Sequence, residues 1–251
     1  MSAAPDGPRD ARVPRELAAL AERYRLDPDA VTRLARLIDS VASDPHAPTT
    51  IRDPRRAVDA HLADSLVALE LVPVRTASRI ADLGAGAGFP GLPLAIALPD
   101  AEVALIESNG RKCAFLGRAV EAARITNAYP VHARAEEWPD GIGRCDLVTV
   151  RALAAPAVVA EYAAPLLRIG GVLVAWRGRR EPEAEDAGVR AAAELGLRVD
   201  QPVRVRPYAG AEHRFLHPMT KLAETPERFP RRAGMALKRP LGERASDRAR
   251  R

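Results

Sequence analysis

The chain has 251 residues, of which 47% are hydrophobic and 28% charged, and its formal net charge is +5. This length suits one α/β domain with a small extension, and the apolar fraction is enough for a sizeable core. No apolar run reaches the ~18 residues that a membrane span needs, and the N-terminus lacks the apolar segment of a secretory signal, so we expect a cytoplasmic protein.

The N-terminal region is predicted to be helical after a disordered start, residues 1–12. Apolar residues recur there at helical spacing, and the helix-starting pair Asp53-Pro54 precedes the last such segment, which Pro73 is expected to end. We expect three helices, over residues 13–25, 28–41 and 54–71. Together, residues 13–73 would form a cap that packs on a sheet and walls one side of a cofactor cleft.

Residues 80–91 combine a short apolar strand, a glycine-rich turn and the start of a helix. The glycines Gly84, Gly86 and Gly88 allow positive φ and let a ligand approach the backbone N–H groups closely. A Gly-x-Gly-x-x-Gly spacing in the same run also satisfies the dinucleotide fingerprint, so a nicotinamide enzyme stays an alternative. The acidic Asp82 favours a cationic ligand, such as the sulfonium and amino groups of adenosylmethionine, over a pyrophosphate.

From residue 79 onward strands alternate with helices, which is typical of a parallel, doubly wound sheet. Parallel strands are expected over residues 79–82, 102–107, 127–132, 146–150 and 171–176. An antiparallel pair is expected over residues 197–207 and 212–222, and a reversed last strand is typical of methyltransferase sheets rather than nicotinamide-type sheets. The prediction is an α/β, Rossmann-like class I methyltransferase fold over residues 79–222, with a mostly parallel seven-stranded sheet whose last strand is antiparallel.

Three strand ends carry candidate cofactor contacts, because ligands of open α/β sheets bind outside the carboxyl ends of the strands. Glu107 ends the second strand, where a carboxylate can accept hydrogen bonds from both ribose hydroxyls of an adenosine; an acid that merely caps the next helix is the alternative. Ala135 and Glu136 follow the third strand, where a small side chain leaves room for adenine; a surface loop is the alternative. Arg151 ends the fourth strand, where the catalytic loop of such enzymes begins.

The loop after Arg151 reads Ala152-Leu153-Ala154-Ala155-Pro156. It has neither the Asn/Asp-Pro-Pro-Tyr motif of exocyclic-amine methylation nor the nucleophilic cysteine of pyrimidine-carbon methylation, which favours an acceptor that needs no general base. The two cysteines, Cys113 and Cys145, and the five histidines show no metal-type spacing. We therefore expect two reduced thiols and no metal.

Basic residues concentrate in the C-terminal part of the chain. From Arg204 onward there are 13 Lys and Arg against 5 Asp and Glu, a net charge of +8, whereas the preceding residues have a net charge of −3. Such asymmetry is typical of a surface that binds a polyanion such as RNA, and a solvated tail is the alternative. Residues 223–251 have little periodicity and are predicted to form a basic arm.

Several runs of this sequence together resemble the RsmG (GidB) family of bacterial methyltransferases. They are Asp82–Ile96, His61–Leu66, Arg134–Glu137, Val150–Ala152 and Phe229–Gly234. The likeness covers about residues 53–241. It implies an adenosylmethionine-dependent enzyme that methylates N7 of a guanine in the 530 loop of 16S ribosomal RNA.

The resemblance also implies roles for individual residues. The adenosylmethionine contacts would be Gly84, Phe89, Ala135, Glu136 and Arg151, and the RNA contacts would include Arg231, Arg232 and Lys238. The sequence departs from the family at residues 43–51, where Trp-Asn and Asn-Leu-Thr are usual, and at Phe229, where tyrosine is usual. No catalytic side chain is expected, because guanine N7 is an unprotonated lone pair that attacks a methyl group without losing a proton.

The expected partner is 16S ribosomal RNA or the small ribosomal subunit, bound by a monomer that does not contact a membrane. Two other functions stay open at this point. A small-molecule methyltransferase would keep its activity without residues 223–251. A non-catalytic RNA-binding protein with a vestigial cofactor fold would not bind adenosylmethionine.

Overall fold

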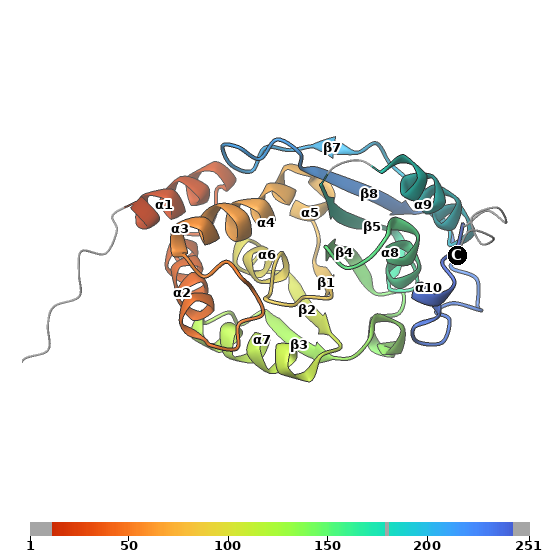
Figure 1. Cartoon of the computed structure of the whole chain (residues 1–251), viewed down its shortest axis with the longest axis horizontal. Helices are drawn as coiled ribbons and strands as arrows, with labels where there is room; N and C mark the ends of the chain where they lie inside the picture. The colour runs from red at the N-terminus through yellow and green to blue at the C-terminus, as the bar shows by residue number, and fades with distance from the viewer. Residues whose placement is uncertain (1–11, 179–180, 243–251) are drawn as a thin grey trace, which may run out of the picture.

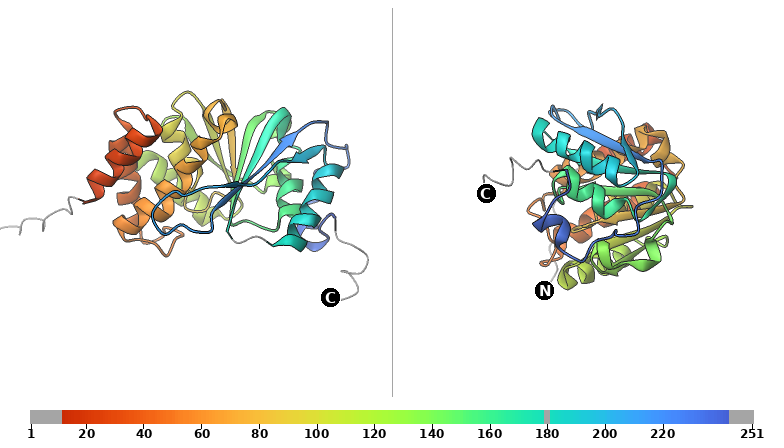
Figure 2. Two further views of the ribbon diagram at one scale, coloured as in Figure 1. Left: turned by 90° about the horizontal axis from the view of Figure 1, so that it is seen from above. Right: turned by 90° about the vertical axis from the view of Figure 1, so that its right-hand side faces the viewer.

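A central sheet lies between two layers of helices in the computed structural model of the chain (Figures 1 and 2). The structure describes residues 12–178 and 181–242. The predicted disordered start therefore lies outside the described residues, apart from residue 12, and so does the end of the predicted arm from residue 243. Within the described ranges, no helix combines the length and the apolar character that crossing a membrane requires.

The strand order across the sheet is β3-β2-β1-β4-β5-β8-β6, with β7 also paired to β8. The strands are β1 (Arg79–Leu83), β2 (Glu102–Glu107), β3 (Ala128–His132), β4 (Cys145–Arg151), β5 (Leu167–Arg177), β6 (Leu197–Val199), β7 (Val203–Arg204) and β8 (Phe215–Lys221). The first five are parallel, and β8 is antiparallel to β5, β6 and β7. The predicted parallel sheet with a reversed last strand is confirmed.

The predicted strand over residues 197–207 is split into β6 and β7. Both pair with β8, β6 with Met219–Lys221 and β7 with Phe215–Leu216, so the two share one position beside β8. Pro202 lies between them and has no N–H for the ladder. The sheet therefore has seven positions across, as predicted, although it contains eight strands.

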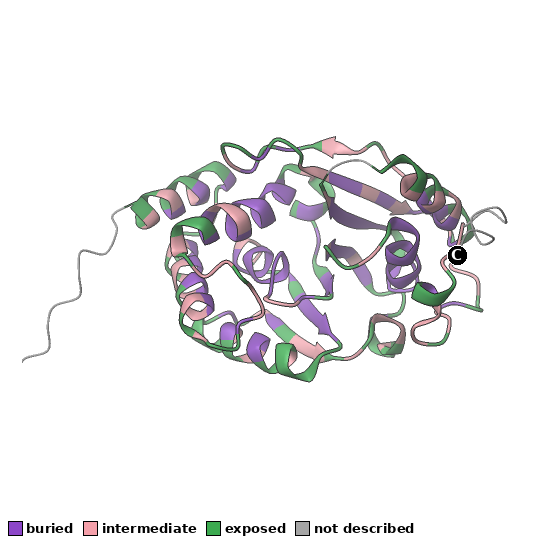
Figure 3. Cartoon of the chain, viewed as in Figure 1, coloured by how far each residue is buried: buried purple, intermediate pink, exposed green. Residues whose placement is uncertain are grey.

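The longer helices are α1 (Arg12–Tyr24), α2 (Ala30–Ser43), α6 (Gly91–Ala97), α7 (Gly110–Ala122), α8 (Pro156–Ala163) and α9 (Pro182–Glu194). Alternate residues of the central strands face the two helical layers. Ile80 and Leu147 pack in a cluster with α1, α2, α6 and α7, whereas Ala81 and Val148 pack in a cluster with α8 and α9. Figure 3 shows that the central strands are almost entirely buried. Both cysteines are free thiols, and Cys145 is buried.

The third predicted helix is a chain of short helical pieces. They are α3 (Pro54–Ala57), a π-helix (Val58–Ala63), α4 (Asp64–Leu66) and a 3₁₀-helix (Val67–Glu70), followed after an extended Leu71 by α5 (Val72–Arg75). Pro73 was expected to end a helix, and it lies instead in the first turn of α5, where its missing N–H leaves no helical hydrogen bond unmade. The π-helix and α4 face the carboxyl ends of the strands, where the site lies.

Candidate cofactor and substrate site

The glycine turn after β1 has the backbone conformation that its sequence predicts. Gly84, Gly86 and Gly88 have φ values of 67°, 55° and 89°, which residues with a Cβ rarely adopt. A Cβ on Gly88 would lie 2.3 Å from the side chain of Leu92, whereas a Cβ on Gly86 would meet nothing closer than a carbonyl oxygen at 3.6 Å. The turn is therefore packed against the protein at Gly88 and open to a ligand at Gly86.

Asp82 supports this turn from beneath. The residue is 1% exposed, and its carboxylate accepts hydrogen bonds of 2.9 Å from the N–H of Gly91 and from Oγ1 of Thr149. Burial raises the pKa of Asp82 to about 6, against the lowering effect of these two donors. The expectation that Asp82 faces a cationic ligand is wrong, because its side chain points into the core and binds the first amide of α6.

Glu107, at the end of β2, contacts the same turn. Its Oε2 accepts a hydrogen bond of 3.1 Å from the N–H of Gly86, and its Oε1 accepts one of 2.8 Å from the N–H of Asn109. Each carboxylate oxygen has a second lone pair. The carboxylate thus holds the open part of the glycine turn, and its contact with ribose hydroxyls stays a prediction.

A first pocket, here called the turn pocket, lies at the carboxyl ends of β1 and β2. Its volume is about 130 Å³, and its lining includes Gly84, Ala135, Glu136, Leu153, Tyr162 and Leu237. The structure thus brings together three of the expected cofactor contacts from two separate segments. Leu153 and Leu237, which no sequence pattern marked, lie over the same pocket.

Phe89 and Arg151, two further expected cofactor contacts, lie together outside the lining of the turn pocket. The Phe89 ring stacks on His61, with ring centroids 4.3 Å apart and an angle of 10° between the planes. The guanidinium carbon of Arg151 lies 5.7 Å from the centroid of the same ring. Phe89 is buried and contacts both of these side chains.

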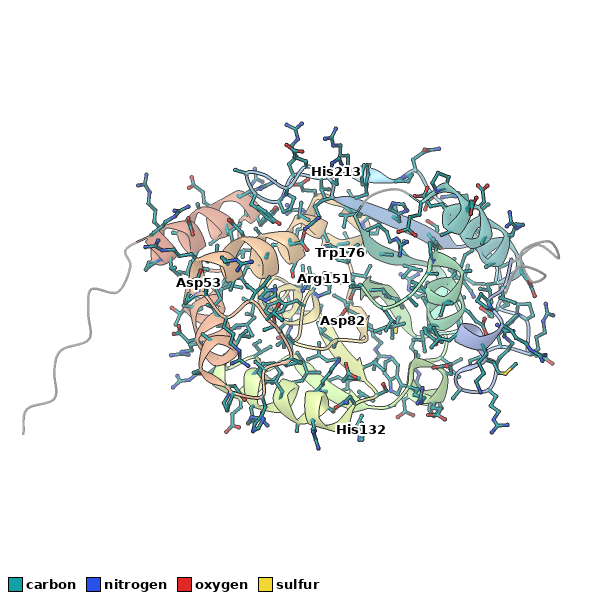
Figure 4. The ribbon with its side chains drawn as sticks, in the orientation of Figure 1. Asp53, Asp82, His132, Arg151, Trp176 and His213 are labelled. Atoms are coloured by element: carbon teal, nitrogen blue, oxygen red, sulfur yellow. The ribbon has the colours of Figure 1, made fainter. Side chains whose placement is uncertain are left out.

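A second pocket, here called the arginine pocket, opens beside them with a volume of about 550 Å³. Its lining includes His61, Asp64, Arg151, Trp176, Arg177 and Arg214. Figure 4 shows Arg151 and Trp176 near the centre of the molecule, whereas His132 and His213 lie toward opposite edges. His61 and Asp64 come from the π-helix and α4, so part of the helical cap lines this pocket. That the cap walls one side of the cofactor cleft stays a prediction.

Asp64 organises the arginine pocket. Its Oδ2 accepts a hydrogen bond of 3.1 Å from Arg151, and its Oδ1 accepts one of 3.1 Å from Nε of Arg214. The indole Nε1 of Trp176 donates to the backbone carbonyl of Asp64 at 2.7 Å. Asp64 therefore fixes two guanidinium groups through its buried carboxylate and one aromatic ring through its backbone carbonyl, around the same space. The His61–Leu66 run of the resemblance marked Asp64, but nothing in the sequence marked Arg214.

His61 is held neutral in this pocket. Burial and the nearby Arg151 charge lower its pKa to about 4. Its Nε2 lies 3.1 Å from Oγ1 of Thr49, whereas its buried Nδ1 has no hydrogen-bond partner among residues 12–178 and 181–242. The imidazole is therefore an uncharged aromatic platform for Phe89 at physiological pH.

The loop after β4 separates the two pockets. Ala152 lines the arginine pocket, whereas Leu153 and Ala154 line the turn pocket. Ala152 has φ of 53°, a strained conformation that costs about 1–3 kcal/mol for a residue with a Cβ. Arg177 donates to the carbonyl of Ala154 at 3.2 Å, which helps to hold the loop in this shape.

The C-terminal arm contains the three expected RNA contacts, and they differ in their surroundings. Arg232 and Lys238 are exposed. Arg231 instead forms an ion pair with Glu161 of α8, in which Nε donates to Oε1 at 2.6 Å and Nη2 donates to Oε2. The side chain of Glu161 is only 2% exposed. Arg231 therefore anchors the arm to the protein, and the RNA contacts of all three residues stay predictions.

Solved structures with the same fold support the architecture. Aeropyrum pernix fibrillarin, solved with bound S-adenosyl-L-methionine, is 21% identical with a TM-score of 0.50, over 63% of this chain and 73% of its own. The fibrillarin pre-rRNA processing protein of Methanococcus jannaschii is 19% identical with a TM-score of 0.50, over 64% of this chain and 74% of its own. At this identity the likeness concerns the fold alone, which is that of class I methyltransferases.

Curated relatives give a closer match. The ribosomal RNA small subunit methyltransferase G of Rubrobacter xylanophilus is 42% identical over 196 residues, covering 76% of this chain and 75% of the relative. The protein of the same name from Chloroflexus aggregans is 41% identical over 198 residues, covering 77% and 82%. The model of the family GidB, described as rRNA small subunit methyltransferase G, matches residues 34–205. The chain therefore belongs to the rRNA small subunit methyltransferase G family.

Proposed function

We propose that this protein transfers a methyl group from adenosylmethionine to N7 of a guanine in the 530 loop of 16S ribosomal RNA. The observation that carries the proposal, within a chain of this family, is the pair of adjacent pockets on either side of the loop after β4. One pocket adjoins the glycine turn, and the other is lined by arginines. A donor and an acceptor could thus meet at this loop.

The residues of the turn pocket and of the adjoining glycine turn fit adenosylmethionine. In the turn, Gly86 leaves the backbone open to a close approach, and Glu107, bound to its N–H, offers carboxylate lone pairs for ribose hydroxyls. In the pocket, Ala135 leaves space for a flat base, and Gly84 and Glu136 are part of the same lining. When bound, the cofactor supplies an electrophilic methyl group on a sulfonium.

The arginine pocket suits the guanine and its neighbouring phosphates. Arg177 and Arg214 offer guanidinium donors, and the Asp64 carboxylate offsets part of their charge. This balance matters because methylation at N7 leaves a positive charge on the base. In this proposal Phe89 and Arg151, held together by His61 and Asp64, separate the two ligands and position them.

No side chain needs to remove a proton in this reaction. Guanine N7 attacks through an in-plane lone pair, so the enzyme accelerates transfer mainly by holding the two reactants in line, which is worth up to ~7–11 kcal/mol of the barrier. His61, whose pKa is lowered to about 4, is uncharged at neutral pH, so its remaining ring N–H is too weak an acid to donate a proton and its other nitrogen is a weak base. We therefore assign it to positioning rather than to acid–base chemistry.

Each part of the chain has a role in this reaction. Residues 13–73 form the cap that walls the arginine pocket, residues 79–222 bind the cofactor, and residues 223–251 bring RNA to the site. The substrate is 16S ribosomal RNA or the small ribosomal subunit, and the protein acts on it as a monomer in the cytoplasm.

Methyl transfer from labelled adenosylmethionine tests the proposal. Small subunits and 16S RNA from cells that lack this protein should accept the label, and chain cleavage at N7-methylguanine should map it to the 530 loop. The matched control is the same RNA with that guanine replaced by adenine. Transfer to small molecules alone would reject the RNA assignment, and calorimetry without any binding of adenosylhomocysteine would reject the enzyme.

A further inference from the structure

The C-terminal arm is docked on the methyltransferase domain beside the turn pocket. Arg231 forms an ion pair with the buried Glu161, and Phe229 and Ala236 pack in the same apolar cluster as α8. The N–H of Gly234 donates to Oε1 of Glu136 at 3.0 Å. Because Glu136 also lines the turn pocket, the arm contacts the pocket wall itself.

Two exposed apolar side chains face this pocket. Leu237, on α10 (Met235–Lys238) of the arm, is 56% exposed, and Leu153, on the loop after β4, is 38% exposed. Both line the turn pocket, from two segments that are far apart in the sequence. Large apolar side chains that stay exposed beside a concave site commonly contact a ligand there.

The turn pocket is narrower than a nucleoside-sized ligand requires. Its volume of about 130 Å³ compares with about 300–1,000 Å³ for typical ligand pockets. Cδ1 of Leu153 lies 2.7 Å from the point where a Cβ on Gly84 would stand, so this side chain covers the glycine turn. The half-exposed Leu153 and Leu237 side chains have more room to move than the buried strand residues around them.

We propose that Leu237 is a cofactor-binding residue, and that the arm therefore forms one wall of the adenosyl pocket as well as carrying RNA-binding residues. Leu153 moves off Gly84 when the cofactor binds, and the adenosyl group then packs against Leu153 on one side and Leu237 on the other. This inference rests on the proposed function, since it concerns the same cofactor. An arm that acted on RNA alone would not contact the cofactor.

Calorimetry with adenosylhomocysteine, on the full chain and without RNA, tests this inference. Leu237→Ala should raise the dissociation constant about five- to tenfold, because apolar contact with the adenosyl group is lost. Leu237→Met should bind within about twofold of the unchanged protein. The matched control is Ile169→Ala, which truncates a similarly exposed apolar side chain near the start of β5, away from the turn pocket. It should bind like the unchanged protein.

Hydrogen exchange gives a second readout that does not depend on affinity. Adenosylhomocysteine should slow exchange of the α10 amides in the unchanged protein, and this protection should weaken in Leu237→Ala. If Leu237→Ala binds as tightly as the unchanged protein and α10 gains no protection, the inference is wrong. Failure of the unchanged protein to bind adenosylhomocysteine would instead overturn the proposed function.

Discussion

Asp82 is a carboxylate whose burial should make stability depend on pH. Its folded-state pKa of about 6 lies above the usual 3.8, so between these values the folded protein binds more protons than the unfolded chain. The free energy of unfolding should therefore fall, through this group, as pH rises from about 4 to about 6.

The variant Asp82→Asn should remove this dependence. Its amide oxygen can accept from Gly91, and its NH₂ can donate to Thr149, because a hydroxyl both accepts and donates. Urea unfolding across about pH 4.5 to 7.5 should show the variant gaining stability relative to the unchanged protein as pH rises. A constant difference between the two proteins would mean that Asp82 does not titrate in this range.

Gly91 is a second residue whose contribution to stability can be measured. A Cβ there would lie 2.4 Å from Leu105 and 2.7 Å from the Asp82 carboxylate, so Gly91→Ala should lower the free energy of unfolding by about 1–3 kcal/mol. The matched control is Gly117→Ala, inside α7, whose Cβ would meet only Pro130 at 4.0 Å. The control should gain about 0.5–1 kcal/mol from helix propensity, and equal effects of the two variants would contradict the packing argument.

At the scale of residues, the sequence predicts the position of the site better than it predicts the contacts of individual side chains. Positive φ at Gly84, Gly86 and Gly88 follows from the lack of a Cβ, so the turn could be predicted. The direction of the Asp82 side chain could not be predicted. The strand pattern shows which residues are buried, but not which hydrogen-bond donors a buried carboxylate meets. Leu237 was missed because its position depends on how the arm folds back.

At the scale of elements, the strands were predictable and the cap was less so. β2 has its predicted bounds, since its apolar run ends at a charged residue. The segment over residues 54–70 has a helical apolar pattern, which does not distinguish an α-helix from a π-helix. α2 begins at Ala30 rather than Pro28, because Oδ1 of Asp27 accepts from the N–H of Asp29 and forms a turn first.

The arm is an element whose docking includes an ion pair between Arg231 and the buried Glu161. Arg231→Ala would leave Glu161 buried without its counter-charge, which should cost about 3–5 kcal/mol. The arm should then detach locally, so trypsin should cut after Lys238 faster than in the unchanged protein. The control Arg232→Ala removes the neighbouring, exposed arginine and should alter neither stability nor this cleavage. Equal cleavage of the two variants would show that the ion pair does not hold the arm.

At the scale of the molecule, the basic C-terminal part is not a uniform cationic surface. Lys221 is buried and donates to the carbonyls of Ala164 and Leu195, and burial lowers its pKa to about 8. Arg214 and Arg231 are bound to Asp64 and Glu161. Counting charges along the sequence therefore overstates the number of cations that can meet phosphates. Lys221 and Arg231 hold the protein together, whereas Arg214, whose side chain is 40% exposed, still offers guanidinium donors to the arginine pocket.

The remaining exposed cations should set the salt dependence of RNA binding. Each phosphate contact contributes about 0.7 to the slope of log K against log salt concentration for single-stranded nucleic acid. The double variant Arg232→Ala/Lys238→Ala should therefore lower the magnitude of this slope by about 1.4. The control Arg15→Ala/Arg36→Ala makes the same charge change on α1 and α2, at the opposite end of the molecule from α10 (Figure 1). This control should leave the slope unchanged, because a change in net charge alone removes no phosphate contact. Equal slopes for the two double variants would show that Arg232 and Lys238 do not contact the RNA backbone.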